Sequence, residues 1–356
     1  MEPYYYSQMN KLKQSAYHAI KTGLLALEPS FPVPRLTGEE LSDIFFRLRL
    51  DCPEIFYAPG FHYRYYQDSV NIQMFPEYLF DKSKIQDHKK AMCARISKLA
   101  RPALSMTEWE KERYIHDFIC ENVRYDKLKK PYSHEIIGPL GNGAGVCEGI
   151  AKTVKVLCDA LGIWCVIAVS DSNPEKNIKY RHAWNIVRIG GVFYHLDVTF
   201  DNSLGHNGLG YNSPGHEGII RYDYFNLGDA QIYRDHEPVI YNVPACTDGN
   251  HFYYKEKKLS FTKKEDIVNR AKQAVRKSRV FIFHWRGGIL NKNMIEELAG
   301  VLEQTAAQKG RHAALGLNWP QAVFQVSFSE LLSGQELEIE KANEGEKECP
   351  EFIPGE

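Results

Sequence analysis

The stretch from Gly141 to Asp201 decides the fold. It reads GNGAGVCEGIAKTVKVLCDALGI at 141–163, WCVIAVS at 164–170 and RHAWNIVRIGGVFYHLDVTFD at 181–201. The first segment joins a glycine-rich turn to a helical pattern, because its apolar residues recur three or four positions apart. The other two segments are rich in β-branched and aromatic residues, which is typical of strands. The sequence therefore predicts a turn, a helix and a group of strands, in that order.

Cys147 stands where the predicted helix begins, since the apolar stripe follows it directly. The glycines at 141, 143 and 145 do not extend the helix, so the thiol faces unpaired backbone N–H groups and the positive end of the helix dipole. The dipole favours a thiolate by ~0.3–1 kcal/mol, which is too little on its own. An adjacent imidazolium is needed, and a partner histidine is therefore expected. The same turn, including Gly145, leaves room for backbone N–H groups to face an oxyanion.

His182 and Asp197 are predicted to form a pair on one hairpin. Gly190 and Gly191 separate two strand-like segments, which is typical of a tight two-residue turn. In that register His182 and Asp197 share a face as diagonal neighbours, ~7–8 Å apart at the backbone. The carboxylate could then orient one ring nitrogen while the other faces a thiol. A three-residue loop would instead place the two side chains on opposite faces.

Each of these residues alone has a plainer explanation. A cysteine before a helix is usually a packed core residue, a strand histidine is usually structural, and an aspartate often caps a turn. The combination of a glycine-rich turn, a cysteine at a helix start and a hairpin with histidine and aspartate on one face favours a Cys147–His182–Asp197 triad.

These residues also carry a family resemblance. GVCEGIAKTVKVLCDALGI, RHAWNIV and YHLDVTFD resemble the core of the transglutaminase-like superfamily, which has a papain-like fold, and most of all its bacterial branch. YIHDFICENVRYD and YDYFNL resemble segments that flank this core, so the resemblance covers about residues 107–245. It implies Cys147 as nucleophile, His182 as general base and acid, and Asp197 as the orienting carboxylate. Ile150 departs from the aromatic residue found in many members, which affects the shape of the pocket.

Three further residues are candidates for substrate binding. Tyr125 borders the cleft in the family interpretation, Gly145 belongs to the turn before the cysteine, and Trp184 shares a face with His182. Packing roles are the alternative for all three. His195 lies nearer the hairpin turn and is a weak candidate for a second base.

Composition narrows the functional classes. Lys and Arg number 44 and Asp and Glu number 45, so we expect no nucleic acid and no membrane surface as partner. The start MEPYYYSQMNKLK lacks the apolar core of a signal peptide, so we expect a cytoplasmic protein, or a secreted one if a signal segment has been removed. The eight cysteines show neither C-x-x-C pairs nor zinc spacing, and no EF-hand loop is present, so no metal and no cofactor are expected.

The chain is long enough for several domains, and an α+β fold class is expected. We predict an N-terminal α+β domain at 1–104 and a transglutaminase-like, papain-like catalytic core at 105–258. A small C-terminal α/β unit follows at 259–332. Residues 333–356 hold eight Glu against two Lys and are predicted to be a disordered acidic tail.

The expected function is enzymatic: thiol-dependent acyl transfer on peptide or glutamine-type amides, with a protein or peptide as substrate. Hydrolysis by a cysteine peptidase or deamidase is favoured over cross-linking, because water is the default acceptor. The alternative is a protein- or carbohydrate-binding scaffold in which flanking domains cover an inactive core.

Overall fold

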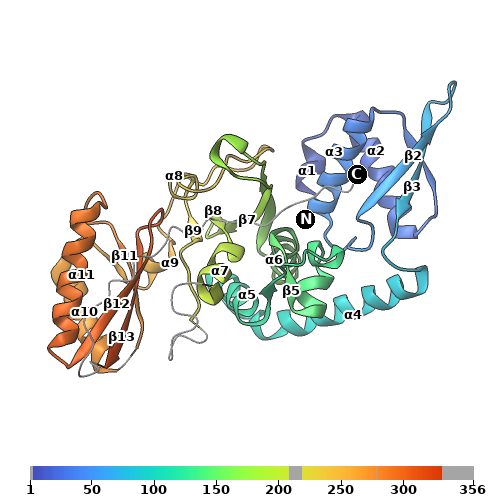
Figure 1. Cartoon of the computed structure of the whole chain (residues 1–356). Helices are drawn as coiled ribbons and strands as arrows, with labels where there is room; N and C mark the ends of the chain where they lie inside the picture. Colours follow the sequence, from blue (N-terminus) through green and yellow to red (C-terminus); the bar gives the residue numbers. More distant parts are fainter. Residues whose placement is uncertain (1–2, 208–218, 278, 331–356) are drawn as a thin grey trace.

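The computed structural model describes residues 3–207, 219–277 and 279–330. The chain forms an elongated molecule in which three groups of elements follow one another along the long axis (Figure 1). The N-terminal elements lie at one end, the helix and strands of residues 141–201 lie in the middle, and the C-terminal elements lie at the other end. The fold class is α+β, as predicted.

The N-terminal part packs helices against a small antiparallel sheet of order β1-β3-β2. Its helices are α1 (Tyr4–Ser7), α2 (Lys11–Ala26), α3 (Gly38–Asp51) and α4 (Lys82–Ala100). Its strands are β1 (Phe31–Pro34), β2 (Gly60–Tyr65) and β3 (Asn71–Glu77). Helix α3 begins with a capping box, in which Thr37 and Glu40 each accept a hydrogen bond from the other's backbone N–H. The cap fixes the start of α3, whose later residues reach the middle of the molecule.

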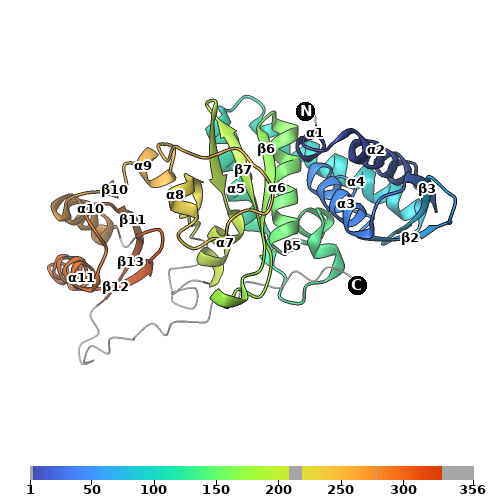
Figure 2. The same cartoon turned by 90° about the horizontal axis from the view of Figure 1, so that it is seen from above.

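The central part places the predicted helix, α6 (Cys147–Leu161), beside an antiparallel sheet of order β6-β7-β8-β9. The strands are β6 (Trp164–Ser170), β7 (His182–Ile189), β8 (Val192–Leu196) and β9 (Phe225–Leu227). The surrounding helices are α5 (Glu108–Asn122), α7 (Val198–Asn207), α8 (Asp229–Ile232) and α9 (Tyr253–Glu256). Short elements connect them: η1 (Arg101–Ala103), β4 (Arg124–Tyr125), η2 (Pro131–His134), η3 (Gly138–Asn142), β5 (Ala144–Gly145) and η4 (Pro174–Lys176). Figure 2 shows α6 lying along this sheet.

The hairpin register agrees with the two-residue turn expected from the sequence. Ile189 pairs with Val192, and Gly190 and Gly191 have φ values of 59° and 85°, which glycine adopts without a side-chain clash. Beyond the last pair of this ladder, Asp197 leaves the strand and leads into α7. The register therefore brings Asp197 back toward the start of β7.

The C-terminal part has α10 (Lys264–Arg276) and α11 (Lys292–Ala307) against a sheet of order β10-β11-β13-β12. Its strands are β10 (Ser260–Phe261), β11 (Phe281–Trp285), β12 (Arg311–Asn318) and β13 (Val323–Glu330). Aromatic rings form much of its core, with Phe283 and Phe324 stacked at 5.1 Å. Along the chain the elements follow in the order β10, α10, β11, α11, β12 and β13, and β10 lies at the sheet edge.

The boundaries at 104, 258 and 332 stay predictions. Helix α4, just before the first boundary, packs against both neighbouring parts. Its residues Ile85 and Met92 join the N-terminal core, and Ala100 joins the central core. The acidic segment 333–356 lies outside the described residues.

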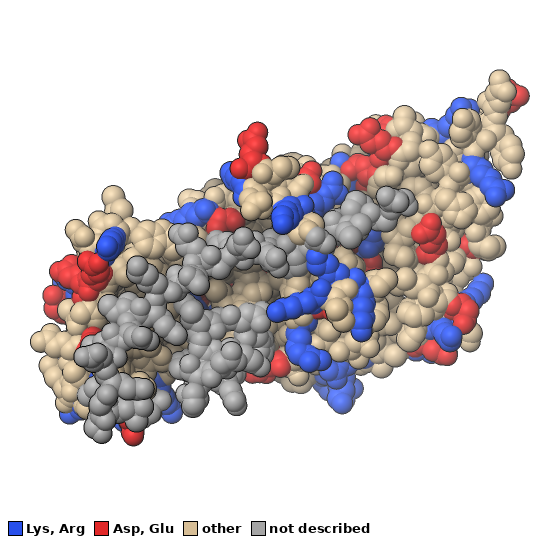
Figure 3. Space-filling view, in the orientation of Figure 1, with Lys and Arg blue, Asp and Glu red and all other residues tan. Residues whose placement is uncertain are grey.

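Lys and Arg side chains (blue) and Asp and Glu side chains (red) both occur along the face shown in Figure 3. In the described part of the chain, no helix is long and apolar enough to cross a membrane.

Candidate active site

Cys147 is the first residue of α6, as the sequence predicts. Val146 precedes it as the N-cap, with no side-chain cap, so the first-turn N–H groups point toward the thiol end of the helix. The helix start is held close to a neighbouring loop: a Cβ added at Gly149 would lie 2.2 Å from the Ser133 carbonyl oxygen. Glycine at 149 thus allows the backbone approach that seats Cys147.

His182 and Asp197 form a buried pair. His182 Nε2 lies 2.5 Å from Asp197 Oδ2, and Asp197 Oδ1 accepts the Phe200 N–H at 3.0 Å. Burial disfavours a charged ring, but the charge and hydrogen bond of Asp197, with a smaller contribution from Cys147, raise the pKa of His182 to about 9. The other ring nitrogen, Nδ1, is buried with no nitrogen or oxygen partner among the described residues. It is the nitrogen left to face the thiol.

A second histidine shares the same carboxylate, and the sequence analysis missed it. His236 Nε2 lies 2.9 Å from Asp197 Oδ2, and its Nδ1 lies 2.8 Å from Asp235 Oδ1. Burial opposes its charge, but the hydrogen bonds to the two carboxylates raise the pKa of His236 to about 9. Although burial alone would raise it, the two imidazoles hold the pKa of Asp197 well below its usual range. No local pattern distinguishes His236, which lies far along the chain from Asp197.

Trp184 lies behind His182. The two rings stack with centroids 5.6 Å apart, and the indole N–H donates to His195 Nδ1 at 2.9 Å. Because Nδ1 accepts, the proton of His195 resides on Nε2, which donates to Asp229 Oδ1 at 2.8 Å. Burial lowers the pKa of His195, so this ring is neutral. His195 thus supports Trp184, and Trp184 supports His182.

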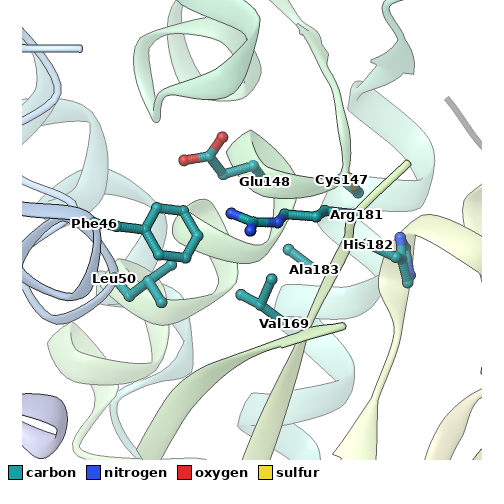
Figure 4. A pocket seen from close by; sticks show the side chains of 8 residues that line it. All are labelled: Phe46, Leu50, Cys147, Glu148, Val169, Arg181, His182 and Ala183. Carbon is teal, nitrogen blue, oxygen red and sulfur yellow. The ribbon is translucent and has the colours of Figure 1, made fainter. Parts of the chain in front are cut away.

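The cavity at Cys147 is small. It has a volume of about 10 Å³, near the minimum for one water molecule, and Cys147 is 4 % exposed. Phe46 and Leu50 of α3 line it together with Cys147 and His182 (Figure 4). Helix α3 therefore closes one side of the cavity at the thiol.

Buried charges fasten α3 to the start of α6. Arg49 of α3 forms ion pairs with Glu135 and with Glu148, the latter at 3.2 Å. Lys152, one turn further along α6, pairs with the same two carboxylates at 2.9 and 2.7 Å. Burial opposes ionisation, but Lys152 and Arg49 hold the pKa of Glu148 well below its usual range. His134 adds a contact of 3.2 Å to Glu148. Glu148, the residue after Cys147, is thus part of the contact between α6 and α3, which we call the Arg49 seam.

The other two predicted binding residues lie elsewhere. Tyr125 and Gly145 pair with each other in the parallel β4–β5 ladder, and neither lines the described cavity at Cys147. A Cβ at Gly145 would lie 2.7 Å from Pro139 Cγ, so this glycine serves close packing. Their roles in substrate binding stay predictions.

Two clusters of described side chains bring ligand-type atoms within 4.8 Å of one another. One consists of His182, Asp197 and His236; the other consists of His195, Asp229 and Cys246. In the second, the donated indole proton keeps the His195 hydrogen on Nε2, the atom that would have to bind a cation. In the first, both histidines use Nε2 toward one carboxylate oxygen. Hydrogen bonding between the members accounts for both clusters.

The chain was compared with protein families and with solved structures. The family model of the transglutaminase-like superfamily matches residues 90–198. A TGase crystal structure is similar, with 13% identity over 40% of this chain and 44% of that chain, at a TM-score of 0.26. A proposed cysteine protease from Cytophaga hutchinsonii shares 17% identity over 39% of this chain and 61% of its own, also at a TM-score of 0.26.

The matched parts span less than two thirds of either of these two chains. No curated protein matches the chain in sequence. The family model ends one residue after Asp197 and includes Cys147 and His182, whereas Arg49 and His236 lie outside it. Residues 90–198 of this chain belong to the transglutaminase-like superfamily.

Proposed function

We propose that this protein catalyses acyl transfer on amide bonds of a protein or peptide, with Cys147 as nucleophile. One observation carries the proposal: a thiol at a helix N-terminus and His182, which is bonded to the buried Asp197, line one cavity. A histidine beside a cysteine can take the thiol proton, which produces the thiolate, the reactive form of cysteine.

The reaction begins when the sulfur of Cys147 attacks the carbonyl carbon of a peptide or glutamine-type carboxamide. The C–N bond breaks, and His182 gives its Nδ1 proton to the departing amine or ammonia. A thioester remains on Cys147. Water then attacks it and loses a proton to His182, which releases a carboxylic acid and restores the thiol.

Water is the favoured acceptor. Water can reach the thioester through any opening that admits the acyl donor, whereas the amine of a second protein would need its own path to the thioester. The activity proposed is therefore that of a peptidase or deamidase, and cross-linking would require a wider opening.

A scaffold function is the second candidate, favoured by the cover over Cys147. Phe46 and Leu50 occupy the position at which an acyl donor would enter, and Arg49 binds their helix to α6. For catalysis, α3 has to move. For a scaffold, it stays in place and the core serves as packing.

Alkylation by iodoacetamide between pH 6 and 8.5, mapped at each cysteine by mass spectrometry, separates the two candidates. The proteins compared are the wild type, Phe46→Ala, and Phe46→Ala combined with His182→Ala. The exposed Cys93 is an internal reference for an ordinary thiol. Catalysis predicts that Phe46→Ala makes Cys147 react faster than Cys93 at pH 6, and that the loss of His182 abolishes this advantage.

If Cys147 in Phe46→Ala reacts no faster than Cys93 at any pH, the enzyme proposal is wrong and the scaffold stands. If it reacts fast, glutamine-containing peptides are assayed for ammonia release, with and without a fluorescent primary amine. Incorporation of the amine in preference to hydrolysis would contradict the choice of water.

A further inference from the structure

The C-terminal part meets the central part around a groove of about 650 Å³, which we call the Trp319 groove. Helices α8 and α9 lie on the side of the central part that faces β11 (Figures 1 and 2). Residues on both sides line the groove, among them Arg234 and Lys255 from one side and Arg286 and Trp319 from the other. It is separate from the cavity at Cys147.

Three cations of the groove lack counter-charges. Arg234 donates to the Pro320 carbonyl at 3.0 Å, Lys255 to the Gly249 carbonyl at 2.9 Å, and Arg286 to the Ser260 hydroxyl at 3.1 Å. None of the three forms an ion pair with a carboxylate among the described residues. Neutral acceptors thus hold these side chains in place and leave their charges uncompensated.

A buried histidine lies close to all three positive charges. His284 lines the groove, and burial together with Lys255, Arg234 and Arg286 lowers its pKa to about 4. The ring is therefore neutral at pH 7. The described lining of the groove therefore carries three positive charges and no carboxylate.

The walls add apolar surface. Trp319 is 53 % exposed and Ile289 is 86 % exposed, and both line the groove. An exposed apolar patch beside three cations offers a contact for an apolar side chain of a ligand.

We propose that the Trp319 groove binds an acidic polypeptide segment of a partner protein, in which an apolar side chain lies between carboxylates. The carboxylates pair with Arg234, Lys255 and Arg286, and the apolar side chain covers Trp319 and Ile289. Such a segment supplies both kinds of group at once, which a free phosphate does not.

A polypeptide fits better than a nucleic acid. A protein that binds a nucleic-acid backbone often neutralises about 6–10 phosphates, so three cations are few for such a ligand. Ile289 and Leu290 provide aliphatic surface where stacked bases would need flat rings. Arg234 lies two residues before His236, so an occupant of the groove would border the segment that holds Asp197. The proposal itself does not depend on the thiol chemistry.

The test is fluorescence anisotropy at 150 mM salt with a labelled peptide of repeated Glu-Leu-Glu, titrated with the full-length protein. Matched peptides replace Glu by Lys or Leu by Gly. The groove variant is Arg234→Gln with Arg286→Gln, and the control variant is Lys272→Gln with Arg276→Gln, two cations of α10 outside the groove. Thermal melting checks that both variants fold.

We expect the Glu-Leu-Glu peptide to bind, the other two peptides to bind at least tenfold more weakly, and the groove variant to lose at least tenfold in affinity. The control variant and Cys147→Ala should bind as the wild type does. No binding, or equal losses in groove and control variants, overturns the proposal. Tighter binding of a single-stranded oligonucleotide or of inorganic phosphate overturns the choice of ligand.

The last peptide to be tested for binding has the sequence of residues 333–340, because Glu336, Glu338 and Glu340 alternate there with Leu337 and Ile339. If it binds more tightly than the designed peptide, the groove is assigned to this chain's own sequence and the partner proposal fails.

Discussion

Replacing His236 by Gln should destabilise the protein in a strongly pH-dependent way. The rise of the His236 pKa from 6.5 to about 9 corresponds to about 3 kcal/mol favouring the charged ring in the folded state. A raised histidine pKa gives stability that is complete below 6.5 and disappears as the pH passes through about 9. The variant should therefore be less stable than the wild type by about 3 kcal/mol at pH 6, and by under ~1 kcal/mol from this source at pH 9.

Urea denaturation at pH 6, 7, 8 and 9 measures this difference in unfolding free energy. His195→Gln is the matched control, because His195 is also buried and bonded to a carboxylate but is neutral. Its loss should cost the same at pH 7 and pH 9. An equal loss for His236→Gln at pH 6 and pH 9 would refute the reasoning, since the ring would then act through packing and not through its charge.

Four further substitutions test other parts of the structure. Burial raises the pKa of Glu112 to about 8, so wild-type stability falls as the pH rises from 4.5 through 8; Glu112→Gln should gain about 3 kcal/mol at pH 7 and nothing at pH 4 by urea denaturation. Gly149→Ala should lower the melting temperature through its clash with the Ser133 carbonyl, at a cost of ~1–3 kcal/mol. Gly300→Ala, in open space on α11, should raise it; equal effects would contradict this account. Arg49→Met should cost ~3–5 kcal/mol in urea, because it leaves buried carboxylates short of one cation, and a loss below 1 kcal/mol would contradict the burial of this seam.

Local patterns in the sequence predicted the helix at Cys147 and the hairpin of His182. Glycines that cannot extend a helix, followed by a regular apolar stripe, fixed where α6 begins. Two glycines between strand-like segments predicted the register of β7 and β8, but the second strand ends at Leu196, before Asp197, and α7 follows. The helix start and the register were predicted correctly because they depend on backbone sterics and short-range periodicity.

The surroundings of the site could not be predicted in the same way. Arg49, Phe46 and His236 reach the site from distant parts of the chain, and nothing in their neighbouring residues marks them out. Their positions depend on how α3 packs on α6 and on how the chain returns after β9. Tertiary packing of this kind leaves no periodic signal in one sequence.

The ion pairs of Arg49 with Glu135 and Glu148 limit where the chain can be truncated for expression. A recombinant fragment of residues 90–198 would keep Glu135, Glu148 and Lys152 but lose the arginine that balances their charge. It would also lose His236, one of the two histidines bonded to Asp197. Such a fragment should aggregate or remain unfolded. A transferable piece has to include both Arg49 and His236, and the family segment alone would not carry the surroundings of its site with it.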